Sequence, residues 1–274
     1  MRGGRRVAAG WVLGMLVACG AWAGWGGGGA VAGETVVVGT NAEFPPFEFR
    51  DKDNEIIGFD VDLVKAIARE AGFEVRFVNH AFDTLITSLA GGRIQLIAAG
   101  LTITDERKEL IDFSAPYYSS ALVMVVREGT EGIERIGDIV DRRVAVQLGT
   151  TGAAKVEEVM TSPKRQLRQF RLYREAFAEL TRGNADVVVV DLPVALNYMR
   201  HVPGLTIAGE PMDEDLFGLG VAKDNPALRD KVNRGLARIR ESGEYDRLVE
   251  KWFGEESAAN GSVAPEKTGT ETAE

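Results

Sequence analysis

Two charged side chains and a pair of backbone N–H groups in this sequence could together hold a small molecule that carries both charges. Arg107 offers a planar guanidinium, which matches a carboxylate in two parallel hydrogen bonds. Asp191 offers a carboxylate that could meet an ammonium group. Backbone N–H groups at Thr102 and Thr151, at or near predicted helix starts, would add donors for the same ligand carboxylate. These residue types suit a small zwitterion.

Two aromatic residues, Phe44 and Phe82, could flank the side chain of such a ligand. Each candidate also has an ordinary structural explanation. An arginine in the first turns of a helix is usually a solvated surface group, and Asp191, directly before a predicted helix, fits an N-cap. Aromatic residues beside Pro45-Pro46 are more often packing residues. The candidates point to a site only if the fold brings them together.

The elements that would position these residues alternate between strand and helix. The expected strands are 36–38, 73–78, 94–98, 143–147, 167–170, 186–190 and 216–222. The expected helices are 60–71, 82–89, 102–110, 151–160, 174–182, 192–200, 227–241 and 245–253. This order predicts an α/β fold with two lobes, each a mostly parallel sheet flanked by helices. The candidate residues follow the strands, and open α/β sheets bind ligands at the carboxyl ends of their strands.

Two segments, 117–126 and 216–222, are predicted to cross between the lobes. If both cross, the second lobe is inserted into the first. The first lobe is then expected to comprise residues 34–117 and 220–254, and the second residues 121–215.

Composition excludes several classes of function. The 274 residues carry a net charge of −9, which argues against nucleic acid as a partner because phosphate binding needs a basic face. One cysteine and two histidines, His80 and His201, supply neither a zinc site nor a Ser-His-Asp relay well. We therefore expect no metal and no cofactor, and nothing in the sequence demands more than a monomer.

The N-terminal residues read as an export signal. Residues 1–18 combine three arginines with a short apolar core that is too short to anchor in a bilayer. The string Leu16-Val17-Ala18-Cys19 resembles a lipobox, so Cys19 is predicted to carry a lipid; cleavage after Ala23 or Ala32 is the alternative. Residues 19–33 are predicted to form a Gly-rich tether, and residues 255–274 a disordered polar tail. The protein is then exported, and lies in the periplasm or at the cell surface.

Motifs throughout residues 35–254 resemble the polar amino-acid-binding proteins of ABC transporters. The matching strings are Gly39–Phe49, Gly58–Leu63, Gly100–Arg107, Asp112–Ser114, Tyr117-Tyr118, Val144–Gly152 and Lys251–Phe253. The resemblance implies a two-lobed periplasmic-binding-protein fold of type II that closes around one amino acid and docks on a membrane permease.

Carried over by position, the resemblance assigns a role to each site residue. Arg107 becomes the clamp for the ligand carboxylate, helped by Gly100, Thr102 and the Thr151 backbone, and Asp191 becomes the partner of the ammonium group. The residues at or beside the side-chain pocket are Asn41, Glu43, Phe44, Phe82 and Gln147.

Three positions bear on ligand identity. Glutamine-type receptors would have an acid at position 41, a lysine at 147 and a histidine at 190, whereas this chain has Asn41, Gln147 and Val190. Without a lysine at 147, nothing at that position repels a cationic side chain, and Glu43 could attract one. The resemblance therefore favours arginine or lysine as ligand. The alternative is an enzyme of the same fold, such as a cyclohexadienyl dehydratase with Glu43 as general acid; a sensor would need membrane spans that are absent after residue 33.

Overall fold

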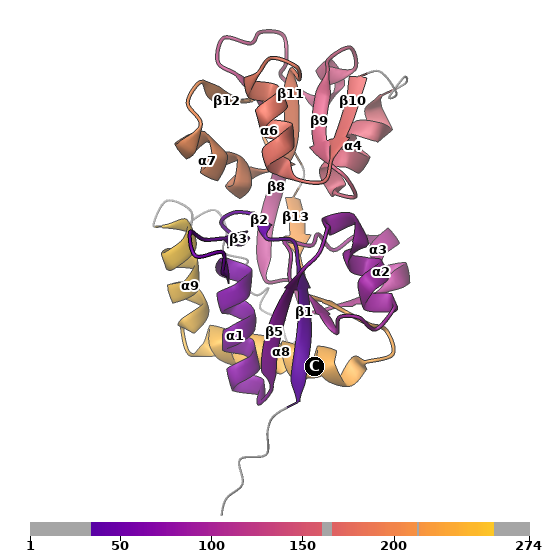
Figure 1. The fold of residues 1–274 in the computed structure, drawn as a ribbon, viewed down its shortest axis with the longest axis vertical. Coiled ribbons are helices and arrows are strands. Elements are labelled where there is room, and N and C mark those ends of the chain that lie inside the picture. The colour runs from indigo at the N-terminus through magenta and orange to yellow at the C-terminus, as the bar shows by residue number, and fades with distance from the viewer. Residues whose placement is uncertain (1–33, 161–165, 213, 255–274) are drawn as a thin grey trace, which may run out of the picture. The chain divides into compact units, whose positions relative to one another are not determined.

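The computed structural model describes residues 34–160, 166–212 and 214–254, all within one compact unit. The predicted export signal, Cys19, the Gly-rich tether and the polar tail lie outside the described residues. Two sheets with their helices form two lobes in the described part (Figure 1).

The first lobe is built on a five-stranded sheet whose central strands are rich in buried aliphatic residues. Its strands, in spatial order, are β5 (Glu74–Asn79), β1 (Thr35–Thr40), β6 (Leu96–Ile97), β14 (Gly220–Val221) and β7 (Asp112–Phe113). A small antiparallel sheet of β2 (Glu43–Phe44), β3 (Glu48–Arg50) and β4 (Ile56–Ile57) accompanies it. This small sheet is not predicted by the sequence pattern, because two- and three-residue strands show no periodicity.

Helices cover the first sheet. They are α1 (Phe59–Ala71), α2 (Leu85–Ala90) preceded by a 3₁₀ turn at Phe82–Thr84, α3 (Asp105–Leu110), α8 (Pro226–Glu241) and α9 (Glu244–Phe253). Helix α1 ends as predicted at Gly72, which adopts the left-handed conformation and donates its N–H to the Ala68 carbonyl. Helices α1, α8 and α9 lie side by side, so the last helices of the chain complete the first lobe (Figure 1).

The second lobe has a sheet with the order β10 (Leu167–Phe170), β9 (Val144–Gln147), β11 (Val187–Asp191), β8 (Tyr118–Arg127) and β12 (Leu205–Ala208). Its helices are α4 (Thr151–Val159), α6 (Tyr173–Thr181) and α7 (Leu192–His201), with a 3₁₀ turn at Ile136–Ile139. Strand β11 is fully buried, as its four consecutive valines predict. In both large sheets every antiparallel pair involves β8 or β14, whereas β1 with β5 and β6, and β9 with β10 and β11, pair in parallel.

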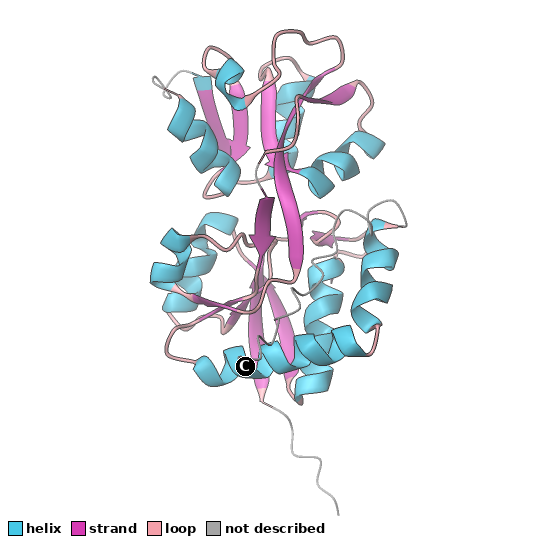
Figure 2. Cartoon of the chain, turned by 180° about the vertical axis from the view of Figure 1, so that it is seen from behind, coloured by secondary structure: helices cyan, strands magenta, loops and turns pink. Residues whose placement is uncertain are grey.

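The two lobes are joined by β8 and by β13 (Glu214–Phe217), which pair along the first half of β8 (Figure 2). The prediction of one strand over 216–222 is wrong, because this stretch contributes to β13 and to β14, which belong to different sheets. The chain turns between them at Gly218, whose N–H donates to the Leu101 carbonyl at 3.0 Å. A Cβ at Gly218 would lie 2.8 Å from the end of the Ile103 side chain, so a larger residue here would require Ile103 to shift.

The predicted helix over 102–110 begins three residues later than expected. Thr104 is its N-cap and accepts the Arg107 N–H through its side chain. Thr102 lies outside the helix and forms a β-bridge with Phe217 instead. The Thr102 backbone therefore lies in a β-bridge and not at a helix start, and the expectation that it opens a helix is wrong.

Candidate functional site

Arg107 is held in a fixed orientation at the boundary between the lobes. Its side chain is buried, with an exposed fraction of 8%. One guanidinium nitrogen donates to the Thr102 carbonyl at 2.7 Å, and another donates to the Gly149 carbonyl of the second lobe at 3.0 Å. The guanidinium carbon lies 5.7 Å from the centre of the Phe82 ring. The solvated-surface explanation for Arg107 therefore does not hold; a buried cation needs acceptors, and an anionic ligand would be one.

Gly100 and Phe44 form the adjoining wall from the first lobe. Gly100 has φ +51, and a Cβ there would lie 2.6 Å from the Phe44 ring. Glycine thus lets the backbone run against the aromatic face. On the other side of Phe44 lies the ring of Tyr173 from the second lobe, 5.6 Å away between centroids.

The start of α4 faces this wall from the second lobe. Thr150 is the N-cap and accepts the Ala153 N–H, and Thr151 is the first residue of the helix. The hydroxyl of Thr151 lies 3.5 Å from that of Thr102 across the boundary. As predicted from its position before a helix, the Thr151 backbone lies at the positive end of a helix dipole.

Asp191 ends the buried strand β11 and occupies the N-cap position of α7. Its carboxylate makes no capping hydrogen bond and instead accepts the Ser120 hydroxyl at 3.1 Å. The N-cap explanation therefore does not account for the side chain. Burial and the nearby charge of Asp215 raise the pKa of Asp191 to about 7, against the lowering by Ser120 and Arg107. An ammonium group beside Asp191 would offset the free-energy cost of burying its ionised carboxylate.

Asn41 and Gln147 meet across the lobes at the end of β1 and the end of β9. Gln147 donates its amide N–H groups to Asn41 Oδ1 at 2.9 Å and to the Arg171 carbonyl at 2.7 Å. Asn41 in turn donates to the His80 carbonyl at 2.8 Å. Both side chains are almost fully buried. They present neutral amides to the cavity.

These residues surround a single small cavity. Its volume is about 10 Å³, and it is lined by Asn41, Phe44, Phe82, Gly100, Thr102, Arg107, Gln147, Thr150, Thr151 and Asp191. All ten sequence-derived ligand residues except Glu43 line it, together with Thr150. With side chains of both lobes in direct contact, the arrangement is closed, and an amino acid would require the lobes to part.

Glu43 does not line this cavity. Its carboxylate forms an ion pair with Arg174 of the second lobe, so it connects the two lobes beside the site. Sequence reasoning did not single out Thr150, Gly149 or Asp215. A Gly-Thr-Thr-Gly turn before a helix could have signalled the first two, whereas no sequence signal distinguishes Asp215 in a crossover strand.

The Glu43–Arg174 pair gives a testable distinction. The Arg174 side chain is 58% exposed, so we expect the pair to contribute at most about 1 kcal/mol. Glu43→Gln and Arg174→Gln should each weaken ligand binding by no more than about fivefold in isothermal titration. A loss of more than tenfold in Glu43→Gln, with tighter binding in Arg174→Gln, would show instead that Glu43 contacts the ligand.

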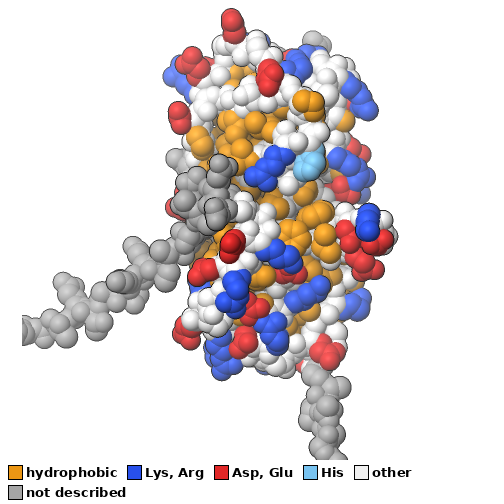
Figure 3. All heavy atoms as spheres, turned by 90° about the vertical axis from the view of Figure 1, so that its left-hand side faces the viewer, with side chains coloured by type: hydrophobic (Ala, Val, Ile, Leu, Met, Phe, Trp, Pro, Cys, Tyr) orange, Lys and Arg blue, Asp and Glu red, His pale blue; other side chains and the backbone are white. Residues whose placement is uncertain are grey.

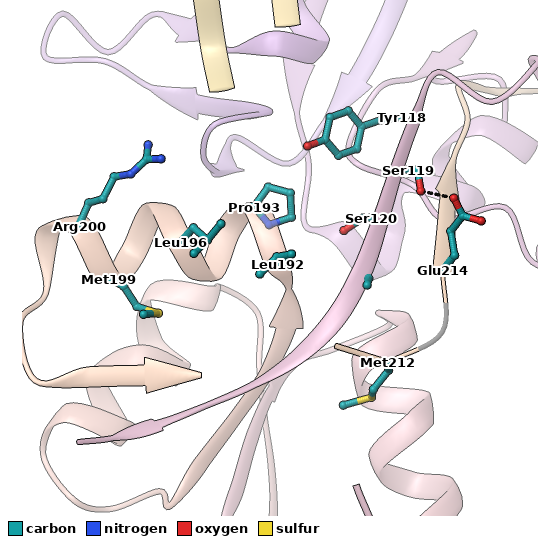
Figure 4. A pocket seen from close by; sticks show the side chains of 11 residues that line it. Tyr118, Ser119, Ser120, Leu192, Pro193, Leu196, Met199, Arg200, Met212 and Glu214 are labelled. Atoms are coloured by element: carbon teal, nitrogen blue, oxygen red, sulfur yellow. Dashed lines mark hydrogen bonds between the residues drawn. The ribbon is translucent and has the colours of Figure 1, made fainter. Parts of the chain in front are cut away.

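A much larger cavity, of about 850 Å³, lies between α7 and β8. Leu192 and Leu196 of α7 lie toward Tyr118 and Ser120 of β8, and Met199 also lines the cavity (Figure 4). Figure 3 faces the side that carries α7 and α9 and shows hydrophobic side chains gathered between charged ones. Size alone would favour this cavity as a ligand site. The small cavity carries the buried guanidinium and carboxylate that a zwitterion needs, which makes it the candidate ligand site.

Within the described residues, no three His, Cys, Asp or Glu side chains are placed to hold a metal ion. No helix in this part of the chain has the length and apolar character needed to cross a membrane.

Comparison with known proteins identifies the family. Residues 36–255 match the model for bacterial extracellular solute-binding proteins, family 3. The ABC transporter arginine-binding protein 1 of Escherichia coli (strain K12) is 34% identical over 230 residues, which is 82% of this chain and 93% of that protein.

Two solved structures agree in fold. An ancestral arginine-binding protein bound to arginine is 40% identical, with a TM-score of 0.78, over 81% of this chain and 100% of that one. The ancestral amino acid-binding protein AncCDT-1, described as a precursor of cyclohexadienyl dehydratase, is 38% identical, with a TM-score of 0.74, over 80% and 95%. The two-lobed fold and the family resemblance are confirmed, and the relatives are named as binding proteins, not enzymes. The chain belongs to the bacterial extracellular solute-binding proteins of family 3.

Proposed function

We propose that the chain captures a basic L-amino acid, arginine or lysine, by closing its lobes, and delivers it to the membrane permease of an ABC transporter. One observation supports the proposal: buried Arg107 of the first lobe and buried Asp191 of the second line the same cavity. A guanidinium and a carboxylate on opposite walls complement the carboxylate and the ammonium of an amino acid.

Two nearby charged groups act on Asp191 in opposite directions. Asp215 raises the pKa of Asp191 more strongly than Arg107 lowers it, so negative charge dominates at this carboxylate. The field of Asp215 also reaches Arg107. The proposal of a basic ligand is supported by relatives that are named as arginine-binding proteins. This argument replaces the one from Glu43, because Arg174 already neutralises that carboxylate.

Closure about β8 and β13 explains how both charged groups can reach one ligand. We expect the ligand to bind the first lobe through Arg107, Gly100 and Phe44. Rotation about the two strands then brings Asp191 and Thr151 onto it. The ligand stabilises the closed form by the contacts that only this form provides.

A thermal-shift screen of amino acids tests the proposal, on protein unfolded and refolded to remove carried-over ligand. At a hundredfold excess over Kd, a ligand adds about 2.7 kcal/mol. For a fold of this size, that corresponds to a rise in Tm of roughly 5–10 °C. We expect this rise with arginine or lysine. A shift with glutamate or leucine and none with arginine or lysine contradicts the basic ligand, and no shift with any amino acid contradicts the proposed function.

A further inference from the structure

Two carboxyl groups are completely buried in the first lobe, close to the ligand site but outside it. Glu48 begins β3, and Asp60 is the second residue of α1; both have an exposed fraction of 0%. The chain neighbours of these two residues belong to an aromatic cluster, in which Phe47 packs against Phe59 and Phe59 against Tyr117. Ionised carboxylates in such surroundings are costly unless they are paired and hydrogen-bonded.

Asp60 connects two functional segments through one of its oxygens. Asp60 Oδ2 accepts the Gly100 N–H at 3.0 Å and the Tyr117 hydroxyl at 2.7 Å. Gly100 lines the ligand cavity, and Tyr117 directly precedes the crossover strand β8. Asp60 therefore fixes the backbone of the ligand wall to the base of the hinge.

The remaining oxygens of the two carboxyls have no donor. Among the described residues, Asp60 Oδ1 and both oxygens of Glu48 are buried without a hydrogen-bond partner. No ion pair to a basic side chain is found for either group in the described part of the chain; the charges that act on them come from each other and from Asp191, with Tyr117 and Tyr245 also facing Asp60. A proton on one carboxyl supplies the missing donor, because two acceptors can bond only through a shared hydrogen.

The electrostatics assign that proton to Glu48. Burial, and then the charge of Asp60, hold the pKa of Glu48 well above its usual value. Burial raises the pKa of Asp60 only to about 6, because Gly100 and Tyr117 donate to its ionised form. On this order of the two pKa values, Glu48 holds the proton when Asp60 is ionised.

We propose that Glu48 is a positioning residue, a neutral acid that donates its proton to Asp60 and so holds Asp60 against the Gly100 amide that shapes the ligand site. The effect on the site rests on the proposed function, whereas the proton-sharing pair itself does not. The pair thus ties ligand affinity to a residue that no ligand touches.

The first experiment tests the pair without any ligand, by infrared spectroscopy of the native protein and Glu48→Gln at pH 7. We expect the native-minus-variant difference spectrum to show the C=O stretch of a protonated carboxylic acid. Carboxylate stretches in its place would overturn the proposal. Glutamine keeps a donor toward Asp60, so the variant should remain folded.

The change of stability with pH is a second test for the proton on Glu48. The folded state keeps the Glu48 proton at pH values where the unfolded chain releases it. The stability that this proton contributes is therefore fully present below the pKa that Glu48 has in the unfolded chain. It is lost as the pH rises toward the pKa of Glu48 in the folded state. In urea unfolding between pH 5 and 8, the unfolding constant of the native protein relative to Glu48→Gln should rise by up to about tenfold per pH unit. If the unfolding constants of the native protein and Glu48→Gln changed in parallel with pH, this would contradict a proton on Glu48.

Ligand affinity tests the link to the site. Glu48→Leu removes the donor and leaves Asp60 Oδ1 unsatisfied, so we expect arginine to bind about tenfold more weakly or worse. Glu48→Gln should restore native affinity. If Glu48→Leu binds as tightly as the native protein, the positioning role is wrong. If the native protein binds no amino acid, the proposed function fails, while the infrared result still decides the pair.

Discussion

Replacing Arg107 with alanine should weaken amino-acid binding by about 2–5 kcal/mol, or roughly 30- to several-thousand-fold. The variant leaves the ligand carboxylate in a closed cavity without its charged partner, and it also leaves the Thr102 and Gly149 carbonyls without their donor. Arg107→Lys keeps the charge but not the planar fork, so an intermediate loss is expected. Isothermal titration with arginine measures both variants.

A matched arginine decides between the two cavities. Arg200 is exposed and lines the 850 Å³ cavity, so Arg200→Ala should bind arginine as the native protein does. Circular dichroism and the melting temperature confirm that each variant is folded. If Arg200→Ala loses binding while Arg107→Ala retains it, the ligand site lies in the larger cavity and our assignment is wrong.

Replacing Asp191 with alanine should cost about 3–5 kcal/mol of binding, because the ligand's ammonium would be buried without a partner. The control is Asp105→Ala, since the Asp105 side chain is 99% exposed on α3 and should not affect binding. Native affinity in Asp191→Ala would refute the ammonium assignment.

The same carboxylate predicts a pH dependence of affinity. With the pKa of Asp191 raised to about 7, a proton competes with the ammonium below that pH. Affinity of the native protein should therefore fall with decreasing pH below about 7, by up to about tenfold per unit, and recover above it. Asp191→Asn should bind weakly at every pH, without this slope. A native profile that is flat between pH 5 and 8 would contradict the raised pKa or the contact itself.

Much of the site follows from the ends of strands. Asn41, Gln147 and Asp191 each come at the end of a run of buried β-branched or small residues, and such runs are strong sequence signals. That they converge on Arg107 is not visible in the residues; motif resemblance supplied it. Contacts between the lobes cannot be predicted from local sequence patterns, for a physical reason. Arg174 lies 131 positions from Glu43, and local periodicity carries no information about such pairs.

The division of segment 216–222 shows a similar limit. An apolar run with two glycines fits one strand, and only the three-dimensional crossing at Gly218 separates β13 from β14. Asp215 went unnoticed for the same reason, since its importance depends on which lobe its strand crosses toward. Burial of strands could be predicted, whereas the path between sheets could not.

The position of β14 has a consequence for the order in which the chain can fold as it is made. Strand β14 pairs with both β6 and β7, so the first sheet lacks its connecting strand until residue 221 has been synthesised. The second sheet needs no residue beyond Phe217 and draws on one continuous stretch from Tyr118. Synthesis runs from the N-terminus at about 5–20 residues per second, so the lobe in the middle of the chain can be complete while the lobe that begins it is still waiting for its last strand and helices.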